Sequence, residues 1–156
     1  MPRRAARTPP TSRAGRTSPA SRTARTTAAL PPDAACPCGL PARYGDCCGP
    51  LHAGTAAAPT AERLMRSRYA AFAVGDAAYL LRTWAAAVRP PELDLDPAVR
   101  WTGLDILGTT GGSAFHAEGT VEFRARYRLD GRDGEQRENS RFVREGGLWV
   151  YVEALT

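Results

Sequence analysis

The second half of the chain alternates between apolar and polar residues. From Phe115 to Leu129 every second residue is apolar or small, and the residues between them are polar or charged. This period of two predicts one long strand with a single apolar face. Residues 130–134, with the sequence Asp-Gly-Arg-Asp-Gly, then provide a hairpin turn. We expect further strands at about 99–107, 135–144 and 148–153.

The middle of the chain has helical spacing instead. Thr60 can cap a helix that runs to about Ala73. Arg68 projects onto the apolar face of this helix, so we expect its side chain to be partly buried. The residues that form this face are Ala61, Leu64, Met65, Tyr69 and Phe72.

A second helix is expected directly after the first. Gly75 and Asp76 can end the first helix and cap the next one. Apolar residues then continue at helical spacing from Ala77 to Val88, and the proline pair at 90–91 stops the helix. Helices followed by an antiparallel sheet indicate the α+β class.

The net charge of +5 comes from the N-terminal segment of the chain. Residues 1–30 hold seven arginines and no acid, which leaves a charge of −2 for the remainder. This distribution removes most of the electrostatic argument for a core that binds nucleic acid. Residues 1–32 are rich in Arg, Pro, Ser and Thr, and we expect them to form a disordered tail. We do not expect nucleic acid as a partner except through that tail.

The 156 residues allow one ordinary domain with a small appendage. No apolar run approaches the roughly 18 residues that a membrane-spanning helix needs. The charged start is not followed by the apolar stretch of a secretory signal. We therefore expect a cytoplasmic protein without membrane contact.

All four cysteines fall within thirteen positions as two close pairs, Cys36 with Cys38 and Cys47 with Cys48. Four soft ligands separated by a short turn can converge on one ion at little loop-closure cost, which favours a structural zinc site. A shell of four thiolates leaves no open position for water, so this zinc would not be catalytic. Two disulfides, a redox pair and an iron–sulfur cluster are the alternatives, and His52 is a weaker candidate ligand.

The spacing of these cysteines also resembles the SEC-C motif, a short zinc-binding segment at the C-terminus of the SecA translocation ATPase and in many other bacterial proteins. The resemblance rests on Cys36-Pro37-Cys38-Gly39, Tyr44 and Cys47-Cys48-Gly49. It implies that Cys36, Cys38, Cys47 and Cys48 are the zinc ligands. Leu40 and Pro41 stand where the motif usually has Ser-Gly.

A longer stretch resembles the YchJ-type family of bacterial proteins, which join a SEC-C motif to a cone-shaped domain like that of nuclear transport factor 2. The matching runs include 47–54, 58–62, 64–69 and 140–142. After the tail at 1–32 that the composition predicts, the resemblance implies a zinc knuckle at 33–52 and a nuclear-transport-factor-2-like (NTF2-like) domain at 53–156. The expected fold is therefore α+β, with helices packed on a bent antiparallel sheet.

A cone of this kind often encloses a pocket, and we expect Arg68, Tyr69, Glu122 and Glu138 to lie near it. His116 is a further candidate acid or base. Catalysis would need an acid or base with a tuned pKa in an apolar pocket. The simpler interpretation is that Arg68 forms a buried ion pair with Glu122 or Glu138, while His116 lies on a solvated face.

The leading functional hypothesis is a zinc-stabilised protein that binds a ligand or another protein, and we lean against an enzyme. A small-molecule enzyme of the isomerase or dehydratase type is the first alternative, and an RNA- or ribosome-associated factor is the second. The candidate partners are an unidentified protein or a small ligand, and a homodimer is one arrangement to test. The fold alone cannot choose among these functions.

Overall fold

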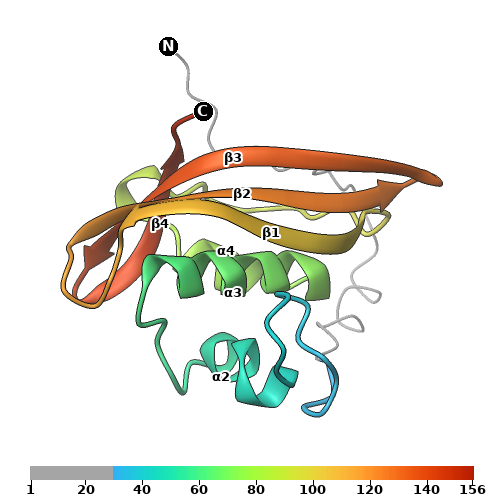
Figure 1. Cartoon of the computed structure of the whole chain (residues 1–156), viewed down its shortest axis with the longest axis horizontal. Coiled ribbons are helices and arrows are strands. Elements are labelled where there is room, and N and C mark those ends of the chain that lie inside the picture. The colour runs from blue at the N-terminus through green and yellow to red at the C-terminus, as the bar shows by residue number, and fades with distance from the viewer. Residues whose placement is uncertain (1–29) are drawn as a thin grey trace.

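The computed structural model describes residues 30–156, so the predicted tail at 1–32 lies almost wholly outside the described residues. The described chain begins with a cysteine-containing segment, continues through three helices and ends in a four-stranded sheet (Figure 1). The α+β class predicted from the sequence is confirmed. No helix in the described part is long and apolar enough to cross a membrane.

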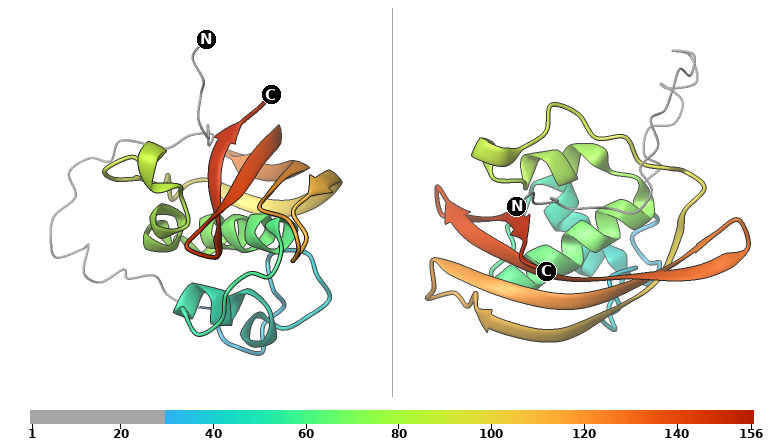
Figure 2. Two further views of the ribbon diagram at one scale, coloured as in Figure 1. Left: turned by 90° about the vertical axis from the view of Figure 1, so that its left-hand side faces the viewer. Right: turned by 90° about the horizontal axis from the view of Figure 1, so that it is seen from above.

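The sheet is antiparallel, and its strands follow chain order. It bends around one long helix, α3 (Ala61–Val74), which lies against its concave side (Figures 1 and 2). The strands are β1 (Arg100–Gly111), β2 (Glu118–Leu129), β3 (Arg132–Glu145) and β4 (Leu148–Ala154).

The alternating pattern of β2 determines which face of the sheet meets α3. Val121, Phe123 and Ala125 are buried on the concave side. Glu122 and Arg124 stand between them and therefore face the opposite side. On α3, Leu64, Met65 and Tyr69 are buried against this sheet, as their helical spacing predicted.

Both ends of α3 have the predicted caps. The Thr60 hydroxyl accepts a hydrogen bond from the Arg63 N–H at 3.1 Å. Gly75 closes the helix in the left-handed conformation, with φ of 81°. Helix α3 thus has a defined start and end, which fixes the register of the side chains that it presents to the sheet.

The long strand begins three residues later than predicted. Residues 115–117 belong to the turn between β1 and β2, and Phe115 is 96% exposed. Gly111 and Gly112 have positive φ, and the Gly112 N–H donates to the Glu118 carbonyl at 3.0 Å. This glycine turn, which the alternation of side chains does not reveal, ends the pairing of β1 with β2.

The second helix is shorter than predicted. Helix α4 (Ala77–Arg82) ends six residues before Val88, and Ala86–Val88 form a separate 3-10 turn. The backbone between them pairs with β4: the Tyr151 N–H donates to the Thr83 carbonyl, and the Ala85 N–H donates to the Tyr151 carbonyl, both at 2.8 Å. These long-range hydrogen bonds replace those that would have continued the helix.

Candidate metal centre and cone pocket

The four cysteine side chains converge at one point beside α3. All four Sγ atoms lie within 4.8 Å of one another, and Cys38 Sγ is 3.6 Å from Cys47 Sγ. A tetrahedral zinc with bonds of about 2.3 Å would place its sulfur ligands about 3.8 Å apart, so the spacing fits such an ion. None of the four is in a disulfide, and all four are buried.

Tight backbone turns bring these cysteines together. The Cys36 N–H donates to the Ala42 carbonyl at 3.0 Å, which closes a short loop around Cys38. Cys47 directly precedes helix α2 (Cys48–Ala53), so Cys48 sits on the first turn of that helix. Gly49 is required here because a Cβ at this position would lie 2.8 Å from the Tyr44 carbonyl oxygen.

The chemistry of the thiols also fits a bound cation. Burial raises the pKa of Cys47 to about 12. Hydrogen bonding to Cys36 raises the pKa of Cys48, whereas hydrogen bonds from Cys38 and Cys48 lower that of Cys36 to about 2. The protein alone therefore favours the thiolate at Cys36 and the protonated thiols at Cys47 and Cys48. A divalent cation would supply the positive charge that four thiolates need.

Two arginines of α3 hold the cysteine segment in place. Arg66 Nη1 donates to the Cys38 carbonyl at 2.8 Å, and Arg63 Nη2 donates to the Cys47 carbonyl at 3.4 Å. The buried Ala70 packs against the cysteines from the same helix. The cysteine segment is thus attached to one face of the helix that crosses the cone.

His52 lies close to the cysteines but has other partners. Its Nε2–H donates to the Ser67 carbonyl at 2.9 Å, and its Nδ1 accepts from the Tyr44 hydroxyl at 2.6 Å. Both ring nitrogens are therefore engaged, which argues against His52 as a substitute ligand. The residue instead connects α2 to α3.

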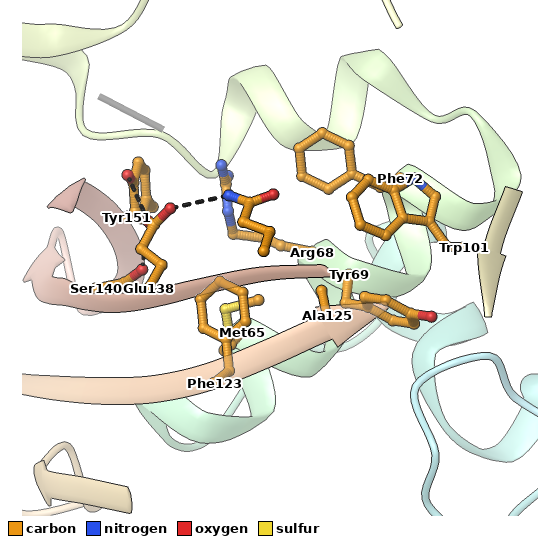
Figure 3. A pocket seen from close by; sticks show the side chains of 11 residues that line it. Met65, Arg68, Tyr69, Phe72, Trp101, Phe123, Ala125, Glu138, Ser140 and Tyr151 are labelled. Carbon is orange, nitrogen blue, oxygen red and sulfur yellow. Dashed lines mark hydrogen bonds between the residues drawn. The ribbon is translucent and has the colours of Figure 1, made fainter. Parts of the chain in front are cut away.

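A cavity of about 40 Å³, partly open to solvent, lies between α3 and the sheet (Figure 3). Its walls are mainly apolar and include Met65 and Phe72 from α3 and Trp101 from β1. Polar groups enter from Arg68 and from Glu138 on β3. The structure therefore brings two of the four predicted pocket residues together as the polar part of the lining.

Arg68 is buried, with 4% of its surface exposed, but the predicted ion pair is wrong. No carboxylate among residues 30–156 lies within 4.0 Å of its guanidinium nitrogens. Its Nη1 donates to the Leu80 carbonyl at 2.8 Å and to the Thr83 hydroxyl at 2.7 Å. The guanidinium carbon lies 4.8 Å from the ring centre of Tyr151 and 5.3 Å from that of Trp84. Neutral partners thus take the place that the sequence interpretation gave to an acid.

Burial lowers the pKa of Arg68 to about 10. The side chain is therefore still charged at neutral pH. Nearby Tyr151, Tyr79 and Glu138 act in the opposite direction and partly offset the desolvation. Arg68 is a buried cation that lacks a direct ion pair.

Glu138 is also buried, with 6% of its surface exposed, and it is held by three hydrogen-bond donors. Its Oε2 accepts from the Ser140 hydroxyl at 2.7 Å and from the Tyr151 hydroxyl at 3.1 Å. Its Oε1 accepts from Gln136 Nε2 at 3.1 Å (Figure 3). An arrangement in which the carboxylate only accepts hydrogen bonds is typical of the ionised form.

The other predicted pocket residues lie elsewhere or turn away. Glu122 is on the outer face of the sheet, where Arg137 Nη2 donates to it at 3.0 Å, so its placement in the pocket was wrong. Tyr69 lines the pocket, but its hydroxyl points away from Arg68 and Glu138 (Figure 3). His116 is exposed in the β1–β2 turn, where it hydrogen-bonds to Ser113.

Three polar pocket residues were missed from the sequence: Gln136, Ser140 and Tyr151. A signal for two of them exists in β3. Gln136, Glu138 and Ser140 share the parity of the buried Phe142, so they face the concave side together. Three polar residues on the inward face of a strand indicate the polar wall of a pocket rather than a purely apolar core.

The comparisons with known proteins agree with this architecture. Residues 60–154 match the family described as "YchJ, middle NTF2-like domain". The chain is 62% identical over 123 residues to a UPF0225 protein of Streptomyces avermitilis, covering 79% of this chain and 85% of that protein. A UPF0225 protein of Streptomyces coelicolor is 61% identical, with 78% and 95% covered. The chain belongs to this YchJ-type UPF0225 family.

Two solved structures have a similar fold, and both are described as SEC-C motif containing proteins. The solution structure of a SEC-C motif containing protein from Rhodopseudomonas palustris has a TM-score of 0.67 and 36% identity, and covers 76% of this chain and 95% of that one. A crystal structure of a SEC-C motif containing protein from Psychrobacter arcticus has a TM-score of 0.63 and 27% identity, with 76% and 80% covered. For this UPF0225 chain, the recognised family and the NTF2-like fold of its main domain are confirmed.

Proposed function

We propose that this UPF0225 protein is a zinc-stabilised ligand-binding protein. Its cysteine cluster would hold one structural zinc ion, and its cone pocket would take up a small molecule. The observation that carries the binding proposal is the pocket itself, an apolar cavity with a buried cation and a buried carboxylate in its lining. A largely apolar cavity with a few placed polar groups is typical of a small-ligand site.

Zinc suits this site because it prefers four thiolate ligands in a tetrahedral arrangement, and the four buried Sγ atoms lie close enough together to provide it. Cys36, Cys38, Cys47 and Cys48 would hold it, and it would supply folding free energy to a segment with little core of its own. The closed set of thiolates leaves no position for a substrate. Free thiols suit a reducing compartment, so the proposal extends to the cytoplasm.

Catalysis is the second candidate function, and the buried carboxylate of Glu138 is the observation that favours it. A carboxylate near a cation in an apolar pocket could accept a proton from a bound substrate, as isomerases and dehydratases require. However, Glu138 already accepts three hydrogen bonds, and neither His52 nor His116 lines the pocket. These contacts support a binding site over a catalytic one.

The binding proposal can be tested with one methyl reporter. The chain has only two methionines, Met1 and Met65, and Met65 lines the pocket. The full chain with ¹³C-labelled methionine methyl groups would be titrated with three compounds of similar shape: isobutyrate, isobutyramide and isobutanol. We expect at least one of them to shift the Met65 methyl resonance in a saturable way.

A matched pair of variants shows whether such a shift reports the pocket. Ala125 lines the cavity, whereas Ala114 is exposed in the β1–β2 turn. Ala125→Leu should fill the cavity and abolish the saturable shift, and Ala114→Leu should leave it unchanged. Ala125→Val provides a smaller change if the leucine disturbs folding, which circular dichroism would show. A folded protein whose Met65 responds to none of the three compounds would contradict the proposal.

A further inference from the structure

Arg68 has one edge that the protein leaves free. A guanidinium carries five N–H donors, and the two on Nη1 are directed to the Leu80 carbonyl and the Thr83 hydroxyl. The Nε and Nη2 groups have no hydrogen-bond partner among residues 30–156. Unlike Arg63 Nε and Trp84 Nε1, they are not sealed inside the protein. Arg68 is one of the residues that line the cavity, so a ligand bound there could reach these free donors.

The remaining neighbours of Arg68 restrict the direction of approach. Tyr151 and Trp84 lie against the guanidinium, at 4.8 and 5.3 Å from ring centre to guanidinium carbon. A ligand can therefore meet Arg68 at the Nε–Nη2 edge rather than over these rings. That edge presents two parallel N–H groups, a geometry that matches the two oxygens of a carboxylate.

From this geometry we propose that the pocket binds a small monocarboxylate, whose two oxygens accept hydrogen bonds from the Nε and Nη2 groups of Arg68. The inference rests on the proposed binding function and adds the chemical class of the ligand. A carboxylate would give the buried guanidinium the direct counterion that no residue of the described chain provides. An unpaired buried charge is costly, so this pairing supplies a favourable contribution to binding.

Glu138 limits the ligand to a single negative charge. It lines the same cavity, and Ser140, Tyr151 and Gln136 already stabilise its carboxylate. A second carboxyl group or a phosphate on the ligand would add repulsion that nothing else in the lining offsets. Monocarboxylates are therefore expected to bind better than dicarboxylates or inorganic phosphate.

The cavity limits the size of the ligand. Its volume of about 40 Å³ is enough for about three water molecules, at roughly 10–15 Å³ each by this measure. Met65, Phe72 and Trp101 form apolar walls that suit a short hydrocarbon body. The ligand is thus a compact, branched or short-chain acid whose hydrocarbon end extends toward the open side.

The test compares isobutyrate with isobutyramide, because the two share a shape and differ in the charge and the second oxygen. Titrations of the full chain would follow the Met65 methyl resonance, with succinate and inorganic phosphate as further probes. We expect isobutyrate to bind at least about tenfold more tightly than isobutyramide, the difference expected from replacing a charge-assisted bidentate contact by a neutral one. Succinate and phosphate should both bind more weakly than isobutyrate.

Two arginine variants connect this preference to Arg68. Arg68→Lys keeps the positive charge but lacks the planar fork, so isobutyrate should lose most of its advantage over isobutyramide. Arg137→Lys makes the same change on the outer face of the sheet, where Arg137 pairs with Glu122, and should bind like the wild type. If Arg68→Lys fails to fold, Ala125→Leu still tests the site with Arg68 intact. That variant should lose the isobutyrate response.

The outcomes separate this inference from the function on which it rests. Equal binding of isobutyrate and isobutyramide at the pocket would overturn the carboxylate class while leaving ligand binding in place. Tighter binding of succinate or phosphate would overturn the single-charge limit. A failure of all the probes to shift Met65 in folded protein would overturn both proposals.

Discussion

Arg68 and Glu138 are two buried charges that share a pocket without forming an ion pair. Each is held by neutral groups instead: a carbonyl, hydroxyls, an amide and aromatic rings. A buried charge held in this way depends on each of its donors or acceptors, because no counterion replaces a lost contact. The stability of the cone should therefore be sensitive to small changes at these positions.

Glu138→Gln tests this dependence, with Glu122→Gln as the matched control. The glutamine amide has only one acceptor oxygen. Its NH₂ group would face one of the donors that hydrogen-bond to the carboxylate in the wild type. We expect the free energy of unfolding to fall by about 1–3 kcal/mol. Glu122 is on the outer face and half-exposed, so its change should stay within about 0.5 kcal/mol. Denaturant unfolding measures both, and equal effects would contradict the placement of Glu138.

For single residues, the sequence predicts which side chains are buried better than it predicts which groups they contact. The helical projection correctly placed Arg68 on the buried face of α3. The alternation in β2 also contains the information that Glu122, out of phase with Val121 and Phe123, faces outward. The partners of Arg68 are Leu80 on α4 and Thr83 just after it, 12 and 15 positions along the chain, and Tyr151 on the distant β4. No local pattern connects those residues to Arg68.

Helix α3 is the element that joins the two candidate sites. Arg63 and Arg66 donate to the backbone of the cysteine segment, while Met65 and Arg68 line the cone pocket. Capping residues and periodicity predicted this helix almost to the residue because they are local signals. The end of α4 was missed because it depends on hydrogen bonds between residues 83–85 and Tyr151. Such hydrogen bonds form only when the sheet is assembled, so the local sequence does not predict them.

The C-terminal cap of α3 provides a prediction for this element. Gly75 has φ of 81° and nothing near the position of an added Cβ, so Gly75→Ala costs only backbone strain. We expect a loss of about 1–2 kcal/mol in the free energy of unfolding. Gly108 also has open space but no left-handed φ, so Gly108→Ala should be neutral or slightly stabilising. Thermal unfolding of both variants measures the difference, and a neutral Gly75→Ala would show that the cap is unimportant.

The whole molecule should lose stability at alkaline pH because several tyrosines are buried. Burial raises the pKa of Tyr69 to about 12 and also raises the pKa of Tyr79 and Tyr151. Above about pH 10, the usual pKa of tyrosine, the unfolded chain releases these protons while the folded chain keeps them. The unfolded state then binds fewer protons, so the free energy of unfolding falls as pH rises toward 12. The lowered pKa of Arg68 changes the stability in the opposite direction, but it is one group against four tyrosines with a raised pKa, Tyr44 included.

Urea unfolding at pH 9, 10 and 11 measures this slope. We expect a progressive decrease over that range, and a shallower decrease for Tyr69→Phe, which removes one of the titrating groups. Stability that stays constant or increases from pH 9 to pH 11 would contradict the burial of these phenols in the folded state.

The account as a whole depends on the cysteine cluster holding a zinc ion, and native mass spectrometry of the full chain tests this most directly. We expect one zinc ion per chain in the wild type. We expect none in Cys47→Ser, because this variant lacks one of the four thiolate ligands. His52→Gln is the matched control: His52 contacts Tyr44 and Ser67, so its loss should lower stability but keep the zinc. A folded wild-type chain with four reduced thiols that takes up no metal when zinc is supplied would contradict the account.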